Sequence, residues 1–382
     1  MEDFLIKMEA GRHGLNKGLI TEPELFAKAI NNIQRKTTYL IFAAPKTFKT
    51  KFVDSFFVLH PFLRNPHEDI EWDYFSFEVD RVNKVADWIA FFFWHDYKIK
   101  YSANHILCRG DNKVKEEHWS LVEKILKERI VPLMGNYDSK GKKISSGKLN
   151  FIEERDNPTG IRNYLLSKIK NEGEMLYEEY ETEENGEIVS KKRLSGFNHA
   201  KPEKFRIVIT DHVRKLRRER GFTMKENLDK YSDYQVQLRN LFGFTFVNII
   251  HTNRSVSDTN RLSMNEGKYL TPMLDDVKDS GNLGEDLNVG ISLLNPELYK
   301  IRNHFDYNVA DWKGMYRSLH LVASRDTEAP KDMSLIGDGA NNLFKSLPST
   351  NDREKIEEFK KIVNAYHKLE YGELFEFPPR SS

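Results

Sequence analysis

Residues 40–51 read LIFAAPKTFKTK, and this stretch decides the fold. The apolar run 39–42 has the character of a β-strand and leads into a short loop that contains a proline. The loop ends in Lys49 and Thr50, directly ahead of the amphipathic segment KFVDSFFVLHPF. This order of strand, loop, Lys-Thr and helix predicts a phosphate-binding loop, in which backbone N–H groups, a helix N-terminus, an ammonium group and a hydroxyl group face phosphates and Mg²⁺.

The match to the phosphate-loop pattern G-x-x-x-x-G-K-[ST] has two departures. Ala43 stands at the first glycine and Phe48 at the second. A bulky residue is awkward where the backbone needs a positive φ, so an ordinary strand–turn–helix with an exposed lysine stays open as an alternative. The residues predicted to bind a nucleotide are Ala44, Pro45, Lys46, Thr47, Phe48, Lys49 and Thr50.

Glu78 follows the next predicted strand. The alternation at 72–77 indicates a strand, and the pattern from Val79 onward indicates a helix. Glu78 would then lie at the carboxyl end of a strand, where open α/β sheets place their chemistry. A carboxylate there can take a proton from an attacking water. A glutamate that caps the helix or is merely solvated is the alternative.

Asp211 ends a second hydrophobic strand, in the segment 204–216 that reads KFRIVITDHVRKL. An acidic residue at such a strand end can hold Mg²⁺ directly or through water, here together with Thr50. The run 214–220, RKLRRER, is predicted as a basic helical face. Such a face is either simply solvated or in contact with nucleic acid.

Periodicity and turn chemistry predict further elements. Thr21 and Pro23 indicate a helix start, for a helix that either packs on the core or docks on a neighbouring subunit. Asn185-Gly186 indicates an exposed hairpin. Helices are predicted at 116–130, 159–180, 227–241 and 351–369, and strands at 244–250, 289–294 and 319–324, the last strand of the chain.

Composition bounds the class of protein. The 382 residues are 39% hydrophobic and 31% charged, and 59 Lys and Arg against 58 Asp and Glu give a formal net charge of +1, so any basic surface must be local. Cys108 is the single cysteine, which excludes an internal disulfide framework and a cysteine-rich metal site. We see no secretory signal, and the aromatic run 88–94 is too short to span a bilayer, so we expect a soluble cytoplasmic protein with no membrane partner.

The pieces resemble, in the same order, the RecA-type ATPase core of the DnaB-like replicative hexameric helicases, motif by motif from about residue 39 to about 347. AAPKTFKT is similar to the family's phosphate loop. FSFE at 75–78 is similar to the family's strand that ends in the water-activating glutamate, and IVITDHV at 207–213 is similar to its metal-binding strand. In IHTNR at 250–254, His251 stands where the family has a glutamine that senses the γ-phosphate.

Two later blocks extend the resemblance. DVKDSGNLGEDLN at 276–288 is similar to the family's loop that runs along single-stranded DNA, and it is the most specific match. Arg325 matches the arginine of a K-x-R motif that reaches the neighbouring subunit's ATP site, whereas Ala323 replaces its lysine. The resemblance implies DNA contacts by Arg254, Lys278, Asp279, Gly281 and Asn282.

The resemblance thus implies an α/β fold, a RecA-like P-loop core with a mainly parallel twisted sheet flanked by helices. It implies ATP and Mg²⁺ as cofactors and, as partners, single-stranded DNA, copies of the same chain in a hexameric ring, and a primase or loader. The implied catalytic residues are Glu78, Lys49, Arg325 and His251.

We divide the chain into a helical arm (1–36), the ATPase core (37–347, with a poorly readable insert and hairpin at 131–204) and a C-terminal helix and tail (348–382). In the family a primase-interaction domain precedes the core, and the short segment before the core here has no counterpart of it. This shorter arrangement is reminiscent of phage-encoded relatives. Two alternatives to a DNA motor stay open. One is a RecA-fold recombination or single-stranded DNA-binding protein switched by ATP, favoured by the departures at Phe48, His251 and Ala323. The other, weaker because no nuclease-like acidic cluster follows the core, is a packaging ATPase.

Overall fold

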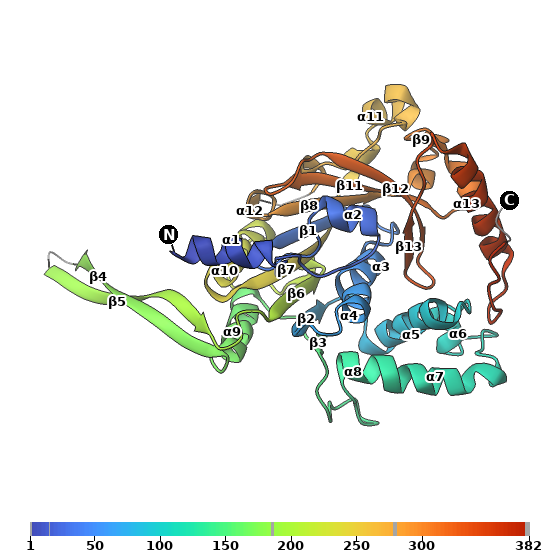
Figure 1. Cartoon of the computed structure of the whole chain (residues 1–382). Helices are drawn as coiled ribbons and strands as arrows, with labels where there is room; N and C mark the ends of the chain where they lie inside the picture. The colour runs from blue at the N-terminus through green and yellow to red at the C-terminus, as the bar shows by residue number, and fades with distance from the viewer. Residues whose placement is uncertain (1, 15, 185–186, 278–280, 379–382) are drawn as a thin grey trace.

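The apolar run ahead of the predicted phosphate loop forms the central strand β1 (Thr38–Ala43) of a nine-stranded sheet (Figure 1). The structure, a computed structural model, describes residues 2–14, 16–184, 187–277 and 281–378. Six neighbouring strands of this sheet are parallel. Their spatial order is β8 (Val289–Leu294), β1, β7 (Phe244–His251), β6 (Phe205–Asp211), β2 (Ile70–Ser76) and β3 (Leu149–Ile152). Beyond β8, the sheet continues with the antiparallel strands β11 (Tyr316–Ser324), β12 (Lys331–Asp338) and β13 (Leu343–Ser346).

The strands predicted from the sequence are confirmed, and the sheet is larger than predicted. The strand predicted as the last one is followed by β12 and β13, and β3 lies at the opposite edge of the sheet. These outer strands are short or begin with polar residues, such as Lys331 and Asp332 in β12. Their alternation of apolar and polar residues was therefore too weak to detect.

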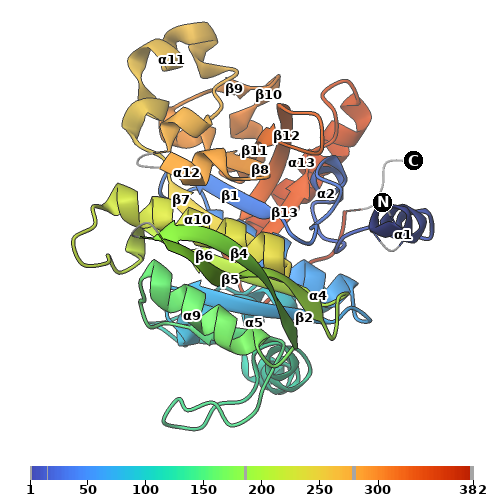
Figure 2. The same cartoon turned by 90° about the vertical axis from the view of Figure 1, so that its left-hand side faces the viewer.

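Helices cover both faces of the sheet (Figures 1 and 2). Alternate residues of β1 point to opposite faces, so Tyr39 and Ile41 join one core and Leu40 and Phe42 the other. The first core is covered by α3 (Lys49–Val53), η1 (Asp54–Leu59), α4 (His60–Arg64) and α5 (Arg81–Tyr97), and the second by α9 (Pro158–Ile169) and α10 (Met224–Phe242).

The turn between β2 and α5 is longer than predicted, because β2 ends at Ser76 instead of residue 77 and α5 begins at Arg81 instead of residue 79. Asp80 is the N-cap of α5, and its carboxylate accepts a hydrogen bond of 3.0 Å from the backbone N–H of Asn83. Glu78 and Val79 therefore lie in a turn between strand and helix, which leaves the Glu78 side chain 34% exposed at the sheet edge.

The middle of the chain contains short helices and a long hairpin. The helix predicted at 116–130 is present as a series of short helical turns, namely η2 (Glu116–His118), α7 (Trp119–Ile125), η3 (Leu126–Ile130) and α8 (Val131–Met134), and α6 (Ala103–Ile106) precedes them. The helix predicted at 159–180 is wrong in its second half, because α9 ends at Ile169 and β4 (Gly173–Glu184) pairs with β5 (Glu187–His199). Cross-strand contacts, such as the ion pair of Glu178 with Arg193, outweigh the helical pattern.

The hairpin β4–β5 projects away from the sheet (Figure 1). The exposed hairpin predicted from the sequence is confirmed in its two strands, whereas the predicted turn at residues 185–186 lies outside the described residues.

The prediction of a basic helical face at 214–220 is wrong. Only the short turn η4 (Val213–Lys215) forms after β6, and the chain then leaves helical geometry at Leu216. Leu216 is buried, and the backbone N–H of Arg217 donates to the carbonyl of Asp156 at 3.0 Å. These contacts with a distant segment hold the basic run in an irregular loop, and α10 begins after it with a capping box between Thr223 and Glu226.

Two segments flank the core. α1 (Glu2–Arg12) and α2 (Glu24–Ala29) precede β1, and Phe26 of α2 packs edge-on against Phe52 and Phe56. The prediction of Thr21 as N-cap is wrong: Pro23 takes that position, and the buried Thr21 hydroxyl donates to the carbonyl of Phe56. The predicted C-terminal helix is confirmed as α13 (Arg353–Lys368). Within the described residues, every helix is too short or too polar to cross a lipid bilayer.

Candidate functional site

The predicted phosphate loop connects β1 to α3. Lys46 and Phe48 have φ values of 63° and 69°, in the left-handed region, so the loop turns sharply twice within three residues. The Thr47 hydroxyl donates to the carbonyl of Ala44 at 2.7 Å, and Pro45 lies exposed between these two residues. Lys49 then opens α3 at the carboxyl edge of the parallel strands.

Phe48 is accommodated by a contact that the sequence did not reveal. Its ring packs so closely on Gly339 that a β-carbon at that position would overlap the ring. The guanidinium of Arg317 lies 4.6 Å from the centre of the same ring, within the range of a cation–π interaction. A glycine opposite and an arginine above therefore hold a bulky residue at a backbone position that favours glycine.

Six side chains meet at the carboxyl edge of the central strands, and we call them the carboxyl-edge cluster: Lys49, Thr50, Glu78, Asp211, His212 and His251. The Lys49 ammonium donates to His251 Nδ1 at 2.8 Å. The Thr50 hydroxyl donates to Asp211 Oδ2 at 2.9 Å. Because β1, β7, β6 and β2 are parallel neighbours, residues far apart in the sequence converge at one edge.

His212 is the member of this cluster to which the sequence assigned no role. Its Nε2 lies 3.5 Å from Glu78 Oε1, and its ring meets that of His251 edge-on at 4.7 Å between ring centres. The polar residue directly after Asp211 at the same strand end was the available signal. Glu78, His212 and His251 also have ligand atoms within 4.8 Å of one another, a spacing that one metal ion can bridge.

Burial sets the protonation of the cluster. It lowers the pKa of Lys49 to about 8, although the charges of Asp211 and Glu78 oppose this effect. It also lowers the pKa of His251 to about 4, with help from the Lys49 charge. Burial raises the pKa of Asp211 to about 6. Near pH 7 the edge therefore carries the Lys49 ammonium group, the Asp211 carboxylate and a neutral imidazole on His251.

The cluster fits Mg²⁺. Asp211 Oδ1 is buried and has no hydrogen-bond partner among the described residues, whereas Asp211 Oδ2 is taken by the Thr50 hydroxyl. A buried carboxylate oxygen without a partner is costly, and a cation that prefers oxygen ligands removes that cost. Thr50 and Asp211 are thus the residues that can hold this ion.

A buried charge network lies behind the cluster. Lys84 Nζ donates to Asp54 Oδ2 at 3.0 Å and to the Tyr74 hydroxyl at 3.0 Å, and all three side chains are fully buried. The Lys84 charge opposes the rise in the pKa of Asp211. This network could not be predicted from the sequence, because a lysine in an apolar helical pattern gives no sign of its partner.

The predicted DNA-contacting segments lie beside each other. The backbone N–H of Asn253 donates to the carbonyl of Asp276 at 2.7 Å, and Thr252 forms a β-bridge with Val277. Arg254 begins the short turn η5 (Arg254–Ser257) that follows β7. Lys278 and Asp279 lie outside the described residues.

Gly281 and Asn282 begin the short helix α12 (Gly281–Glu285). The backbone N–H of Asn282 donates to Asp229 Oδ1 of α10 at 3.0 Å. Gly281 has a φ of 35°, and a β-carbon there would overlap the Asp229 carboxylate. The glycine therefore permits the close approach of this segment to α10.

Arg325 is separated from the cluster within one chain. Ser324 at the end of β11 pairs with Val289 at the start of β8, and the backbone N–H of Arg325 donates to the carbonyl of Asn288 at 3.0 Å. Arg325 thus lies at the amino edge of the parallel strands, opposite the edge that carries the cluster. Its guanidinium donates to the carbonyl of Glu285 at 2.8 Å.

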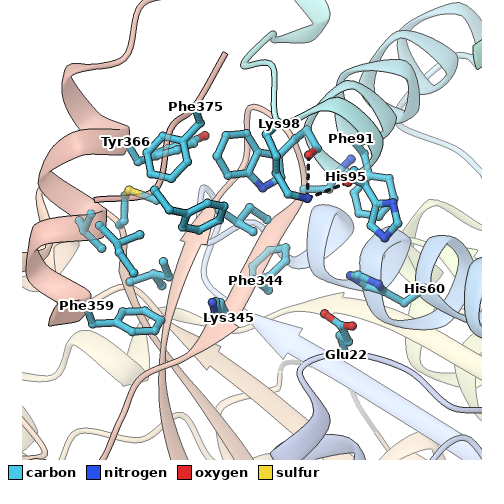
Figure 3. Close-up of a pocket in the computed structure, with 18 residues that line it drawn as sticks. Glu22, His60, Phe91, His95, Lys98, Phe344, Lys345, Phe359, Tyr366 and Phe375 are labelled. Atoms are coloured by element: carbon cyan, nitrogen blue, oxygen red, sulfur yellow. Dashed lines mark hydrogen bonds between the residues drawn. The ribbon is translucent and has the colours of Figure 1, made fainter. Parts of the chain in front are cut away.

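An apolar cavity of about 240 Å³ lies away from the cluster, beneath α13 (Figure 3). Aromatic side chains from α5, β13, α13 and the C-terminal tail form its walls, including Phe91, Phe344, Phe359 and Phe375. None of the cluster residues lines it.

Comparisons with known proteins establish the fold. No family model and no curated protein matches the sequence. Among solved structures, the chain is similar to one of an ATPase domain, with a TM-score of 0.63 and 14% identity over 91% of this chain and 98% of that one. It is also similar to a DnaB-like replicative helicase, from a structure of that helicase and its interactions with primase, with a TM-score of 0.60 and 13% identity over 86% of this chain. The chain spans only 63% of the length of that helicase. The predicted fold class, a RecA-like core with a mainly parallel sheet, is confirmed, and so is the resemblance to the DnaB-like type at the level of the fold.

Proposed function

We propose that this chain is a Mg²⁺-dependent ATP hydrolase of the DnaB-like type, a ring-forming motor that moves along single-stranded DNA during replication. The observation that carries the proposal is the convergence of Lys49, Thr50, Glu78 and Asp211 on one sheet edge, beside a sharply turned loop that leads into a helix N-terminus. This set supplies an ammonium group, metal ligands and a base at one place, which is what phosphoryl transfer to water requires.

The loop and Lys49 bind the triphosphate. Loop residues 46–48 offer backbone N–H groups, and the Lys49 ammonium is the cation that pairs with the β- and γ-phosphates. With a pKa of about 8, Lys49 is charged at pH 7. Thr50 and Asp211 hold Mg²⁺, which when bound neutralises charge on the phosphates.

Glu78 orients and deprotonates the attacking water. Its side chain is part exposed, so water can reach the carboxylate. His251 accepts a hydrogen bond from Lys49 through Nδ1, so its Nε2–H is the donor that can meet the γ-phosphate and report its presence.

Arg325 acts on the neighbouring subunit's nucleotide. It lies at the amino edge, away from its own chain's cluster, which supports a contact made in trans within a ring. Such an arginine finger raises the rate by roughly 10³–10⁵. Arg325→Ala should bind ATP and not hydrolyse it, and mixing it with Lys49→Ala subunits should restore activity. No recovery at any mixing ratio would contradict the trans geometry.

We assign contacts with the DNA backbone to the predicted residues around Arg254 and at 278–282. Backbone N–H groups and short polar side chains there suit phosphates without reading bases, so binding should be sequence-blind and weaken with salt. A primase or a loader is the further partner that we propose for a motor of this type.

The testing experiment is the ATPase rate with and without single-stranded DNA. We expect Mg²⁺-dependent turnover that the DNA stimulates, closed six-fold rings in negative-stain images with an ATP analogue, and loss of nucleotide binding in Lys49→Ala. A wild-type chain that neither binds nor hydrolyses ATP would overturn the proposal.

An ATP-switched single-stranded DNA-binding protein is the second candidate. The observation that favours it is Phe48, which lies between Gly339 and Arg317 in the phosphate loop, a part of the site that fast turnover needs. Turnover that DNA does not stimulate, together with filaments instead of rings, would favour this candidate.

A further inference from the structure

His212 presents its Nε2 atom to Glu78, and the bonding of its other ring nitrogen fixes where the imidazole hydrogen lies. Its Nδ1 accepts a hydrogen bond of 3.2 Å from the backbone N–H of Arg214, within the short turn η4 that follows β6. A ring nitrogen that accepts such a bond carries no hydrogen, so the imidazole hydrogen is on Nε2. Nε2 is the atom that lies 3.5 Å from Glu78 Oε1.

The same bonding argues against a metal ion shared by Glu78, His212 and His251. His251 Nδ1 accepts from the Lys49 ammonium, as His212 Nδ1 accepts from Arg214, and so each Nε2 carries a hydrogen. A metal ion would need one of these lone pairs and would lie close to the Lys49 charge. Lys49 and His251 are therefore joined by a hydrogen bond, the two imidazole rings meet edge-on, and His212 Nε2 faces Glu78.

We propose that His212 is a positioning residue, which holds the Glu78 carboxylate through its Nε2–H so that the second carboxylate oxygen faces the attacking water. This inference rests on the proposed function and adds to it. Glu78 lies in a turn between β2 and α5, and its side chain is 34% exposed, so a fixed partner is needed to restrict it. His212 is buried and is itself fixed by the η4 turn and by the His251 ring.

Two amide variants separate this role from a structural one. His212→Asn places an amide oxygen near the position of Nδ1, where it can accept from Arg214, but the side chain is too short to reach Glu78. His212→Gln places an amide N–H near the position of Nε2, within reach of Glu78. Because partners that orient a reactive group are typically worth about ten- to a hundredfold in activity, we expect kcat to fall by that factor in His212→Ala and in His212→Asn.

We expect His212→Gln to recover most of the wild-type kcat. The KM for ATP should change less than about threefold in all three variants, because His212 does not hold the phosphates. In a Glu78→Gln background, His212→Ala should cause no further loss. His199→Ala is the matched control, because His199 is also a part-buried histidine with a lowered pKa but lies at the end of β5, away from the cluster.

Three results would overturn the inference: full activity in His212→Ala, recovery by Asn but not by Gln, or a further loss on the Glu78→Gln background. Thermal unfolding of each variant identifies those that fail to fold, and the comparison of Asn with Gln then uses the folded ones. Failure of the proposed function has a different signature, because the wild-type chain itself would then hydrolyse no ATP.

Discussion

The carboxyl-edge cluster and the apolar cavity beneath α13 both bury histidine side chains, but they surround them differently. In the cluster, Nδ1 of His212 and Nδ1 of His251 each accept a hydrogen bond. In the cavity, His60 lies against the edge of Phe91, and its Nδ1 has no hydrogen-bond partner among the described residues (Figure 3). Burial, with the charges of His95 and Arg64, lowers the pKa of His60 to about 3.

This difference shows what marks a reactive place in this molecule. The cavity is bounded mainly by apolar and aromatic side chains, and Lys98 in its wall donates to the carbonyls of Trp94 and His95. The side chains of the cluster are complementary donors, acceptors and charges at the ends of parallel strands. Convergent polar chemistry, rather than hollow volume, distinguishes the candidate site.

The largest expected difference between the two regions concerns turnover. Glu78→Gln should lower kcat by roughly 10²–10⁴ while ATP binding is retained, because the amide cannot take a proton from water. Phe359→Ala in the cavity wall should leave kcat per folded molecule unchanged. Steady-state ATPase assays with matched binding titrations measure both, and an equal loss in the two variants would break the comparison.

The free energy of unfolding should respond in the opposite order: a substitution in the cavity wall should lower it more than one in the cluster. Phe344 is buried and packs edge-on against Phe52 at 5.5 Å between ring centres, so Phe344→Ala should cost about 3–5 kcal/mol of unfolding free energy. Glu78→Gln should change it by less than about 0.5 kcal/mol, as part-exposed positions usually do. Urea unfolding gives both values. A small loss for Phe344→Ala would mean that this wall is not part of the core.

His60 should make the cavity region sensitive to acid. Its folded pKa of about 3 is below the unfolded value of 6.5, so the unfolded chain binds the proton first and stability falls as the pH drops from about 6.5 toward 3. At pH 5 the loss is about 2 kcal/mol, from about 1.4 kcal/mol for each pH unit. His60→Leu should remove this part of the pH dependence, measured by urea unfolding at pH 7 and pH 5. Identical slopes in the two proteins would contradict it.

A small effect on stability is expected at Phe48. Phe48→Gly relieves a left-handed backbone cost of roughly 1–2 kcal/mol but loses the contacts with Gly339 and Arg317, of which the cation–π contact alone is worth about 0.5–1 kcal/mol. We therefore expect a net change in stability below about 1 kcal/mol. Thermal unfolding measures it, and a loss above about 2 kcal/mol would show that the ring is part of the core.

Much of the site could be predicted because its signals are local. A strand, a loop and Lys49-Thr50 are adjacent in the sequence, and Glu78 and Asp211 each follow a hydrophobic strand directly. Parallel strands bring their carboxyl ends to one edge, so separate strand ends sufficed to predict that these residues lie together. The predicted DNA contacts stay predictions, since the structure describes only the backbone link between their two segments.

The sequence by itself determined the alternation of apolar strands and helices and the polar residue at the end of each strand, because these depend on neighbours within one element. The tertiary structure alone decided that His212 lies against Glu78, that Gly339 makes room for Phe48, and that Arg325 lies at the far edge. Such pairings join residues far apart in the chain, and periodicity fixes which face a side chain takes but not which partner it meets there.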